Sequence, residues 1–326
     1  MLQSVPMAEI WRGPFLESQH RGHAVICDDS GQIVEAWGDP DKIVLSRSAS
    51  KMIQALPLIQ SGAADAAGLS AEQLALACAS HSSMPVHVSL VEGWLAALQL
   101  SEKDLRCGAH YPMDRETEVS MIASGEKPTQ CHNNCSGKHA GFLTLTRHLA
   151  AGPEYVEADH PVQKAVLEQF ERVTGETSPG FGVDGCSAPN FASSLHGMAR
   201  AMARFAASPE GSAEARLHGA MRQHPEYVAG DRRACTELMR ATGGRVALKT
   251  GAEGFYTAIL PDQKLGIALK IEDGTTRAAE CAMAAILVKL GVLEADHPAT
   301  LSYANAPIRN RREITTGHIR PAPGLM

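Results

Sequence analysis

The feature that most constrains the fold of this 326-residue chain is a strand-like pattern near both ends, enclosing a long helical pattern over residues 51–242. Residues 24–27 and 33–37 flank an Asp-Asp-Ser-Gly turn, which predicts a β-hairpin. Further strands are predicted at residues 42–45, 245–249, 254–260 and 265–271, and a closing helix at 276–290. We therefore expect an α/β fold in which residues 1–50 and 243–326 build one mainly antiparallel sheet with flanking helices, and residues 51–242 form an inserted helical subdomain, so that residues 1–326 make a single unit.

Composition excludes two classes of partner. The formal net charge is −6 and no basic run occurs, so nucleic acid is not expected to bind. The longest apolar run, residues 281–288, is far shorter than the roughly 20 residues of a membrane helix. The first ten residues lack the pattern of an export signal, and the eight cysteines are scattered, so we expect a cytoplasmic protein with free thiols.

One candidate nucleophile lies where the 42–45 strand passes into a helix. Ser48 and Lys51 are three residues apart and would share a helix face, so hydroxyl and amine could form a hydrogen bond. A lysine can activate a serine only where its surroundings favour the neutral amine. A Ser-x-x-Lys pair arises about 0.7 times by chance in such a composition, and a capped surface helix explains it equally well.

A second motif, Lys249-Thr250-Gly251, ends a predicted strand and is expected by chance only about 0.04 times. Ser-x-x-Lys and Lys-Thr-Gly, together with Ser-Asp-Asn, mark class A β-lactamases and penicillin-binding proteins. No Ser-x-Asn occurs in this sequence. Ser80, in a Ser-rich step after a predicted helix, could supply the missing hydroxyl and pair with Lys249, although a capping loop is the simpler interpretation.

Cysteine and histidine gather at the start of a predicted helix, between Cys131 and His139, and a further cysteine, Cys186, lies in a Gly-rich turn. Two thiolates and one nitrogen would suit a soft divalent metal and leave an open position. The spacing contains no Cys-x2-Cys pair, so buried free thiols remain the competing interpretation.

Taken together, these motifs resemble the Rhizobium-type (class 3, thermolabile) L-asparaginases. The resemblance runs in order over nearly the whole chain and rests on five segments, residues 46–51, 80–82, 131–141, 183–189 and 249–254.

The resemblance implies a fold similar to serine β-lactamases and serine-dependent glutaminases, and hydrolysis of L-asparagine to aspartate and ammonia. It implies two Ser-Lys tandems, Ser48 with Lys51 and Ser80 with Lys249, with Ser48 as the acylated nucleophile. It further implies a homodimer. The zinc ion that it implies has three ligands: Cys135, Lys138 and Cys186.

The substrate carries a carboxylate and an ammonium, so charged residues next to these motifs are candidate contacts. Arg47 suits the carboxylate through a bidentate contact, and Asp184 and Glu253 suit the ammonium. His139, next to Lys138, is either a substrate contact or a helix-surface residue.

Three alternatives stay open at this stage: a serine glutaminase, a penicillin-recognising enzyme or peptidase, and a non-catalytic metal-binding module. Turnover of asparagine against glutamine, acylation by a penicillin, and loss of fold in Cys135→Ala would separate them.

Overall fold

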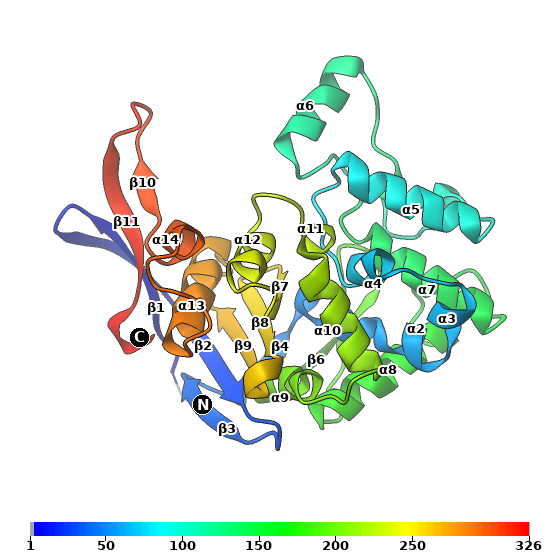
Figure 1. Cartoon of the computed structure of the whole chain (residues 1–326), viewed down its shortest axis with the longest axis horizontal. Coiled ribbons are helices and arrows are strands. Elements are labelled where there is room, and N and C mark those ends of the chain that lie inside the picture. The colour runs from blue at the N-terminus through cyan, green and yellow to red at the C-terminus, as the bar shows by residue number, and fades with distance from the viewer. Residues whose placement is uncertain (1–2, 326) are drawn as a thin grey trace. The chain divides into compact units, whose positions relative to one another are not determined.

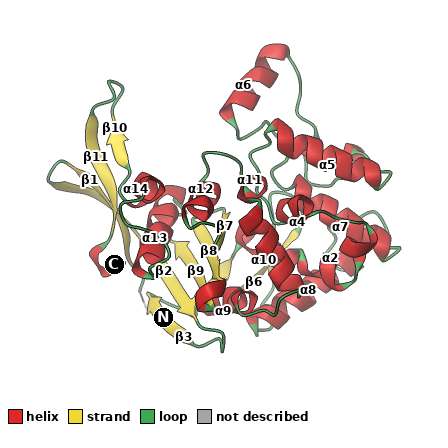
Figure 2. Ribbon diagram, viewed as in Figure 1, coloured by secondary structure: helices red, strands yellow, loops and turns green. Residues whose placement is uncertain are grey.

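The computed structural model describes residues 3–325 and divides into two compact units. The first unit comprises the chain up to Ala49, the segment Ser193–Ala207 and the chain from Glu237 onward. The second comprises Ser50–Ala192 and Ser208–Thr236. Figure 2 shows the strands concentrated in the first unit and helices dominating the second.

The first unit contains the sheet and the helices that cover it. The strands of this sheet are β1 Val5–Arg12, β2 Phe15–Cys27, β3 Ile33–Trp37, β7 Ala247–Gly251, β8 Phe255–Leu260, β9 Leu265–Ile271, β10 Pro307–Arg309 and β11 Thr315–Pro321. The predicted strand at 42–45 forms as β4 Ile43–Leu45 but lies outside this sheet. The helices of the first unit are α9 Leu195–Ala206, α13 Thr276–Lys289 and α14 Pro298–Ala304, and α12 Ala234–Ala241 begins just before the boundary.

The sheet joins both ends of the chain, as predicted. Its order is β10-β11-β1-β2-β9-β8-β7, with β3 paired to β2, and its pairings are antiparallel (Figure 1). Ala24 of β2 faces Leu269 of β9, which joins the early hairpin to the late strands. The strand β1 and the β10–β11 hairpin were not predicted. For β1 the reason is a proline and two register shifts, which break the alternation of buried and exposed residues.

Two helices pack on this sheet. Every residue of β8 is buried, so both faces of that strand are covered, and α9 and α13 both contact it. A Cβ on Gly266 of β9 would lie 2.0 Å from the backbone nitrogen of Ala203 in α9, so only glycine permits this approach. We expected residues 193–207 in the helical part, but α9 belongs to the first unit because it packs on β9.

The second unit is almost entirely helical. Its helices are α1 Lys51–Gln54, α2 Leu56–Gln60, α3 Ala63–Ala66, α4 Ala71–Ala77, α5 Pro85–Ala97, α6 Arg115–Ser124, α7 Ser136–His148, α8 Pro161–Thr174, α10 Ala213–Gln223 and α11 Pro225–Val228. The short strands β5 Phe181–Val183 and β6 Pro189–Ser194 pair antiparallel.

Local signals in this unit are confirmed in detail. Ser70 and Gln73 form the predicted capping box of α4.

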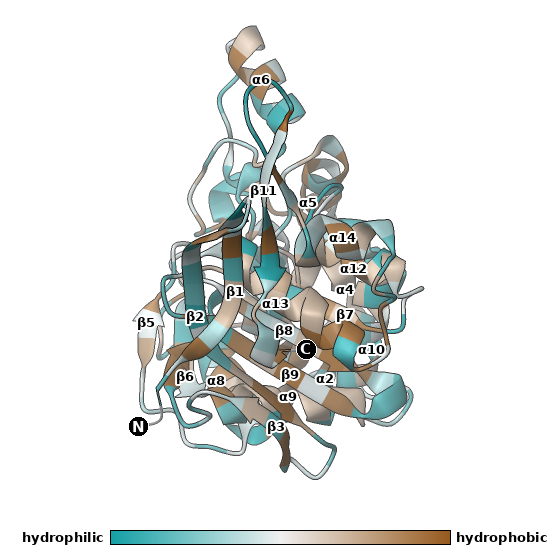
Figure 3. Ribbon diagram, turned by 90° about the vertical axis from the view of Figure 1, so that its left-hand side faces the viewer, coloured by the Kyte–Doolittle hydropathy of each residue, from teal (hydrophilic) through white to brown (hydrophobic). Residues whose placement is uncertain are grey.

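Helix α6 buries Met121, while its Val119 and Ile122 side chains are exposed. Figure 3 shows both hydrophobic and hydrophilic stretches along the α6 ribbon.

None of the helices within residues 3–325 combines the length and the apolar character that crossing a membrane requires.

Candidate active site

The second unit brings a buried lysine to the Ser80 hydroxyl. Lys51 opens α1, its side chain is 1% exposed, and its Nζ lies 3.0 Å from Ser80 Oγ. The same amine donates to the backbone oxygen of Ala79 and lies 3.1 Å from Cys135 Sγ. Burying an amine is costly unless it has polar partners, and these contacts supply them.

A second buried lysine meets a second cysteine. Lys138 lies in the first turn of α7, and its Nζ is 3.0 Å from Cys186 Sγ. Although burial lowers the pKa of Lys138, the sulfurs of Cys186 and Cys135 raise it above its ordinary value. A hydrogen bond from Cys135 and the nearby Lys138 charge hold the pKa of the Cys186 thiol well below its usual range. We call Lys51, Ser80, Cys135, Lys138 and Cys186 the Lys–Cys cluster.

Local structure explains why the two cysteines point at these lysines. Cys135 precedes α7, and its backbone N–H donates to Asn133 Oδ1 at 2.8 Å. Cys186 lies in the turn between β5 and β6, which closes through a bond of 3.0 Å from the N–H of Asp184 to the oxygen of Ala188. Cys135, at the start of α7, therefore meets Lys51 of α1, and Cys186, in the hairpin turn, meets Lys138 of α7.

The cluster matches the donor types predicted for zinc. Within residues 3–325, no three His, Cys, Asp or Glu side chains gather as a metal-binding group. The predicted ligand set has only two such side chains, Cys135 and Cys186, and a lysine amine as the third donor. Lys138 Nζ is 3.0 Å from Cys186 Sγ, so two of the three predicted ligands are in contact, and two thiolates and an amine are donor types that suit a zinc ion.

In the first unit, the segment that carries Ser48 packs on the strand that carries Lys249. A Cβ on Gly251, at the end of β7, would lie 2.5 Å from the backbone oxygen of Ser46, and Thr257 Oγ1 donates to the oxygen of Ala49 at 3.1 Å. Ser48 is half-buried in a short 3-10 helix, Arg47–Ser50. Lys249 is buried, and its Nζ donates to the oxygen of Thr250 at 2.8 Å.

The four residues of the predicted Ser-Lys pairs are thus divided between the two units. Lys51 and Ser80 lie in the second unit and contact each other, a pairing that the sequence did not suggest. Ser48 and Lys249 lie in the first unit. The pairings of Ser48 with Lys51 and of Ser80 with Lys249 stay predictions.

The predicted substrate contacts differ in their surroundings. Arg47 is half-buried with φ of 50° and Glu253 is exposed with φ of 61°, both in the left-handed region that non-glycine residues rarely adopt. Asp184 is half-buried in the turn before Cys186. His139 is not a helix-surface residue: it is 0% exposed, and burial lowers its pKa to about 4.

A tyrosine that no motif predicted also belongs to this site. Tyr155 is 0% exposed, and its hydroxyl lies 2.9 Å from Nδ1 of His139. It occurs in an irregular segment before α8 without a spacing signal, so only the folded chain reveals it.

A family model described as L-asparaginase II matches residues 8–321. The chain belongs to this family. It is an amidohydrolase that acts on L-asparagine, and the match confirms the resemblance drawn from the motifs. The L-asparaginase II assignment covers both units, including the Lys–Cys cluster.

Solved structures resemble this member of the L-asparaginase II family only remotely. Mglu in its tris and glutamate form is 13% identical, with a TM-score of 0.49 over 90% of this chain and 64% of that chain. A β-lactamase from Mycobacterium bovis is 13% identical, with a TM-score of 0.44 over 82% and 94% of the two chains. A class C β-lactamase from Rhodobacter sphaeroides is 14% identical, with a TM-score of 0.43 over 83% and 95%. No curated protein matches the sequence. At these scores the likenesses decide nothing about the site.

Proposed function

We propose that this chain hydrolyses L-asparagine by acyl transfer to Ser48. The Ser48 hydroxyl attacks the side-chain carboxamide carbon while neutral Lys51 accepts its proton. The proton passes to the leaving nitrogen, so ammonia departs and an ester links the aspartyl group to Ser48. Water then attacks that ester, which releases L-aspartate and restores the hydroxyl.

The observation that supports this chemistry is the buried Lys51 amine at 3.0 Å from Ser80 Oγ. An amine held at hydrogen-bond distance from a hydroxyl can pass a proton to or from it. We assign Ser80 and Lys249 to this relay and to the activation of the water in the second step. In this scheme Lys51 exchanges protons with both serines.

Charged residues around the proposed nucleophile would hold the amino-acid part of the substrate. Arg47 precedes Ser48 and would take the α-carboxylate. Asp184 and Glu253 would take the α-ammonium. His139 is fully buried, so it is not assigned a hydrogen bond to the substrate. The left-handed φ values of Arg47 and Glu253 support this assignment, because strained backbone persists mainly where function needs it.

Zinc would be held by Cys135, Lys138 and Cys186. When bound, the ion would act as a Lewis acid or orient the substrate. The lysine must lose a proton to bind it, so zinc affinity should fall as pH drops. Zinc content measured across pH at a fixed free-metal level tests this, and a flat profile contradicts it.

Two variants test the nucleophile. Ser48→Ala and Ser80→Ala are compared with Ser302→Ala, which changes an exposed hydroxyl, and folding is checked by circular dichroism. Ser48→Ala should abolish ammonia release and leave no covalent adduct in mass spectra of acid-quenched enzyme. Ser80→Ala should slow turnover by about 10²- to 10⁴-fold yet still form the adduct. An adduct in Ser48→Ala would assign the nucleophile to another residue.

The main alternative substrate is L-glutamine. Its side chain is one methylene longer, which a pocket distinguishes by roughly 10- to 200-fold. Ammonia release from both amides under identical conditions decides between asparaginase and glutaminase.

We further propose that the chain is a cytoplasmic homodimer. All eight cysteines are free and buried, as a reducing compartment requires. Phe15, at the tip of the β1–β2 hairpin, is 73% exposed and suits an interface. Light scattering should give twice the chain mass of 34.7 kDa, whereas a monomer would contradict the proposal.

A further inference from the structure

Tyr155 is an unassigned residue that connects the site to the protein around it. Its hydroxyl has two partners in the second unit: the backbone N–H of Arg106 at 2.7 Å and Nδ1 of His139 at 2.9 Å. Its ring meets the His139 ring edge to face at 5.4 Å. The side chain is fully buried, so water cannot replace either partner.

The direction of these two bonds follows from a donor inventory. The Arg106 N–H can only donate, so the Tyr155 oxygen accepts there. The single hydroxyl proton is then paired only if it points to Nδ1 of His139. A neutral His139 that accepts at Nδ1 carries its own proton on Nε2.

We propose that Tyr155 is a positioning residue that holds His139 in the Nε2–H tautomer and aims this N–H at Cys186. Nε2 is buried and has no hydrogen-bond partner among the residues the structure describes. The Cys186 sulfur is the acceptor with which the His139 side chain interacts. A donor directed at a thiolate tunes a ligand without binding the metal itself.

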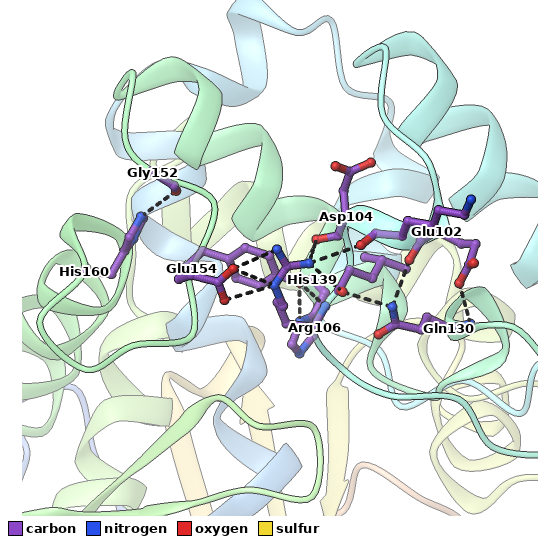
Figure 4. Close-up of polar contacts among 11 residues, drawn as sticks. Glu102, Asp104, Arg106, Gln130, His139, Gly152, Glu154 and His160 are labelled. Carbon is purple, nitrogen blue, oxygen red and sulfur yellow. Dashed lines mark hydrogen bonds and ion pairs between the residues drawn. The ribbon is translucent and has the colours of Figure 1, made fainter.

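Polar contacts brace the segments that surround Tyr155, and Figure 4 shows those of Arg106 and Gln130. Arg106 forms a bidentate pair with Glu154, at 3.0 Å from Nε to Oε2 and 2.9 Å from Nη2 to Oε1. Gln163 Nε2 donates to the backbone oxygen of Tyr155 at 2.8 Å. Gln130 braces the Arg106 segment by donating to the oxygen of Leu105 at 3.0 Å. These bonds restrain the backbone near Arg106 and near Tyr155 itself.

The direct test is the tautomer of His139. In protein labelled with ¹⁵N-histidine, two-bond ¹H–¹⁵N correlations distinguish a protonated Nε2 from a protonated Nδ1. We expect Nε2–H in the wild type and a mixture of tautomers in Tyr155→Phe. An Nδ1–H form in the wild type, or an unchanged pattern in Tyr155→Phe, overturns the proposal.

Other histidines calibrate this spectrum. Ser83 N donates to Nδ1 of His81 at 3.2 Å, so His81 should show Nε2–H. Arg277 donates to Nε2 of His20 at 3.2 Å, so His20 should show Nδ1–H. Both patterns should be the same in Tyr155→Phe, which also shows that the variant is folded.

The consequence for catalysis rests on the proposed function and is measured separately. Tyr155→Phe should lower kcat by about 10- to 100-fold, as loss of outer-shell partners typically does. Tyr227→Phe is the matched control, because that ring also lies beside a histidine, at 6.1 Å from His87, and should change kcat less than about twofold. An equal loss in both variants contradicts a specific role for Tyr155.

The His139 side chain offers an independent check. A glutamine amide can place a donor near the Nε2 position, whereas an asparagine amide reaches only the Nδ1 position. His139→Gln should therefore retain more activity than His139→Asn, and the reverse order contradicts the assigned tautomer. The spectra need no asparagine turnover, so failure of the proposed function and failure of this inference give different results.

Discussion

Two buried polar regions of this asparaginase give their side-chain nitrogens different partners. In the Lys–Cys cluster of the second unit, the amines of Lys51 and Lys138 meet sulfurs, a hydroxyl and a backbone oxygen. In the first unit, buried histidines beside β9 meet carboxylates: His20 Nδ1 lies 2.5 Å from Asp273 Oδ2, and His23 Nε2 lies 2.6 Å from Glu272 Oε1.

This difference in partners indicates that the first-unit pairs stabilise the fold, whereas the Lys–Cys cluster takes part in the reaction. A carboxylate that accepts a hydrogen bond from an imidazole holds that ring in place, so these pairs are structural. Thiols and hydroxyls can themselves exchange protons or bind a metal, so a lysine placed among them shares a reactive site. We therefore expect substitutions in the cluster to change activity and metal binding, and substitutions in the first-unit pairs to change stability.

The largest effect is expected from Lys51→Met. Removing the proposed base should reduce ammonia release by about 10²- to 10⁴-fold. The control is Lys42→Met, whose amine lies 3.0 Å from Glu272 in the first unit and whose loss should change the rate less than about twofold. Steady-state kinetics gives the rate of both variants. Similar rates would contradict the proposal that the cluster, and not the first-unit pair, takes part in the reaction.

Metal binding should distinguish the cysteines. Cys186→Ala removes a proposed thiolate ligand and should weaken zinc binding by about 100-fold or more. Cys281→Ala is the control, because burial in α13 raises the pKa of that thiol to about 12 and disfavours a thiolate. Zinc is measured by elemental analysis after dialysis against a weak chelator. Zinc loss from both variants would show that removing any buried cysteine weakens zinc binding, which contradicts a ligand role for Cys186.

In the first unit, a substitution that disturbs packing should change the free energy of unfolding. Gly266→Ala places a methyl group against the α9 backbone and should lower the free energy of unfolding by about 3 kcal/mol. Gly219→Ala in α10 meets no atom within 4 Å and should be neutral or stabilising by up to about 1 kcal/mol. Urea denaturation gives both values. Equal stability of the two variants would contradict the close approach.

The smallest effect concerns pH. Although burial opposes it, the hydrogen bond to His20 lowers the pKa of Asp273 to about 2, below its unfolded value near 3.9. The carboxylate therefore stabilises the fold above about pH 4, and this contribution is lost as pH falls toward 2. Because Asp273 is half-exposed, we expect about 1 kcal/mol or less. Asp273→Asn should flatten the pH dependence of unfolding in this range, and an unchanged slope would assign it to other groups.

Local sequence determined the elements that carry the chemistry. The early hairpin, the late strands β7 to β9, helix α13 and the Ser70 capping box were predictable, because turn residues and hydrophobic periodicity act over a few positions. Motifs in chain order also identified the family and every residue of the Lys–Cys cluster.

Tertiary structure decided which of these residues meet. Lys51 contacts Ser80 and Cys135, 29 and 84 positions away, and no spacing rule covers such separations. Tyr155 joined the site without any motif, and His139 proved buried although its position in a helix start is compatible with exposure. Side-chain pairing depends on how helices pack, and packing is set by the summed burial of many residues rather than by any local pattern.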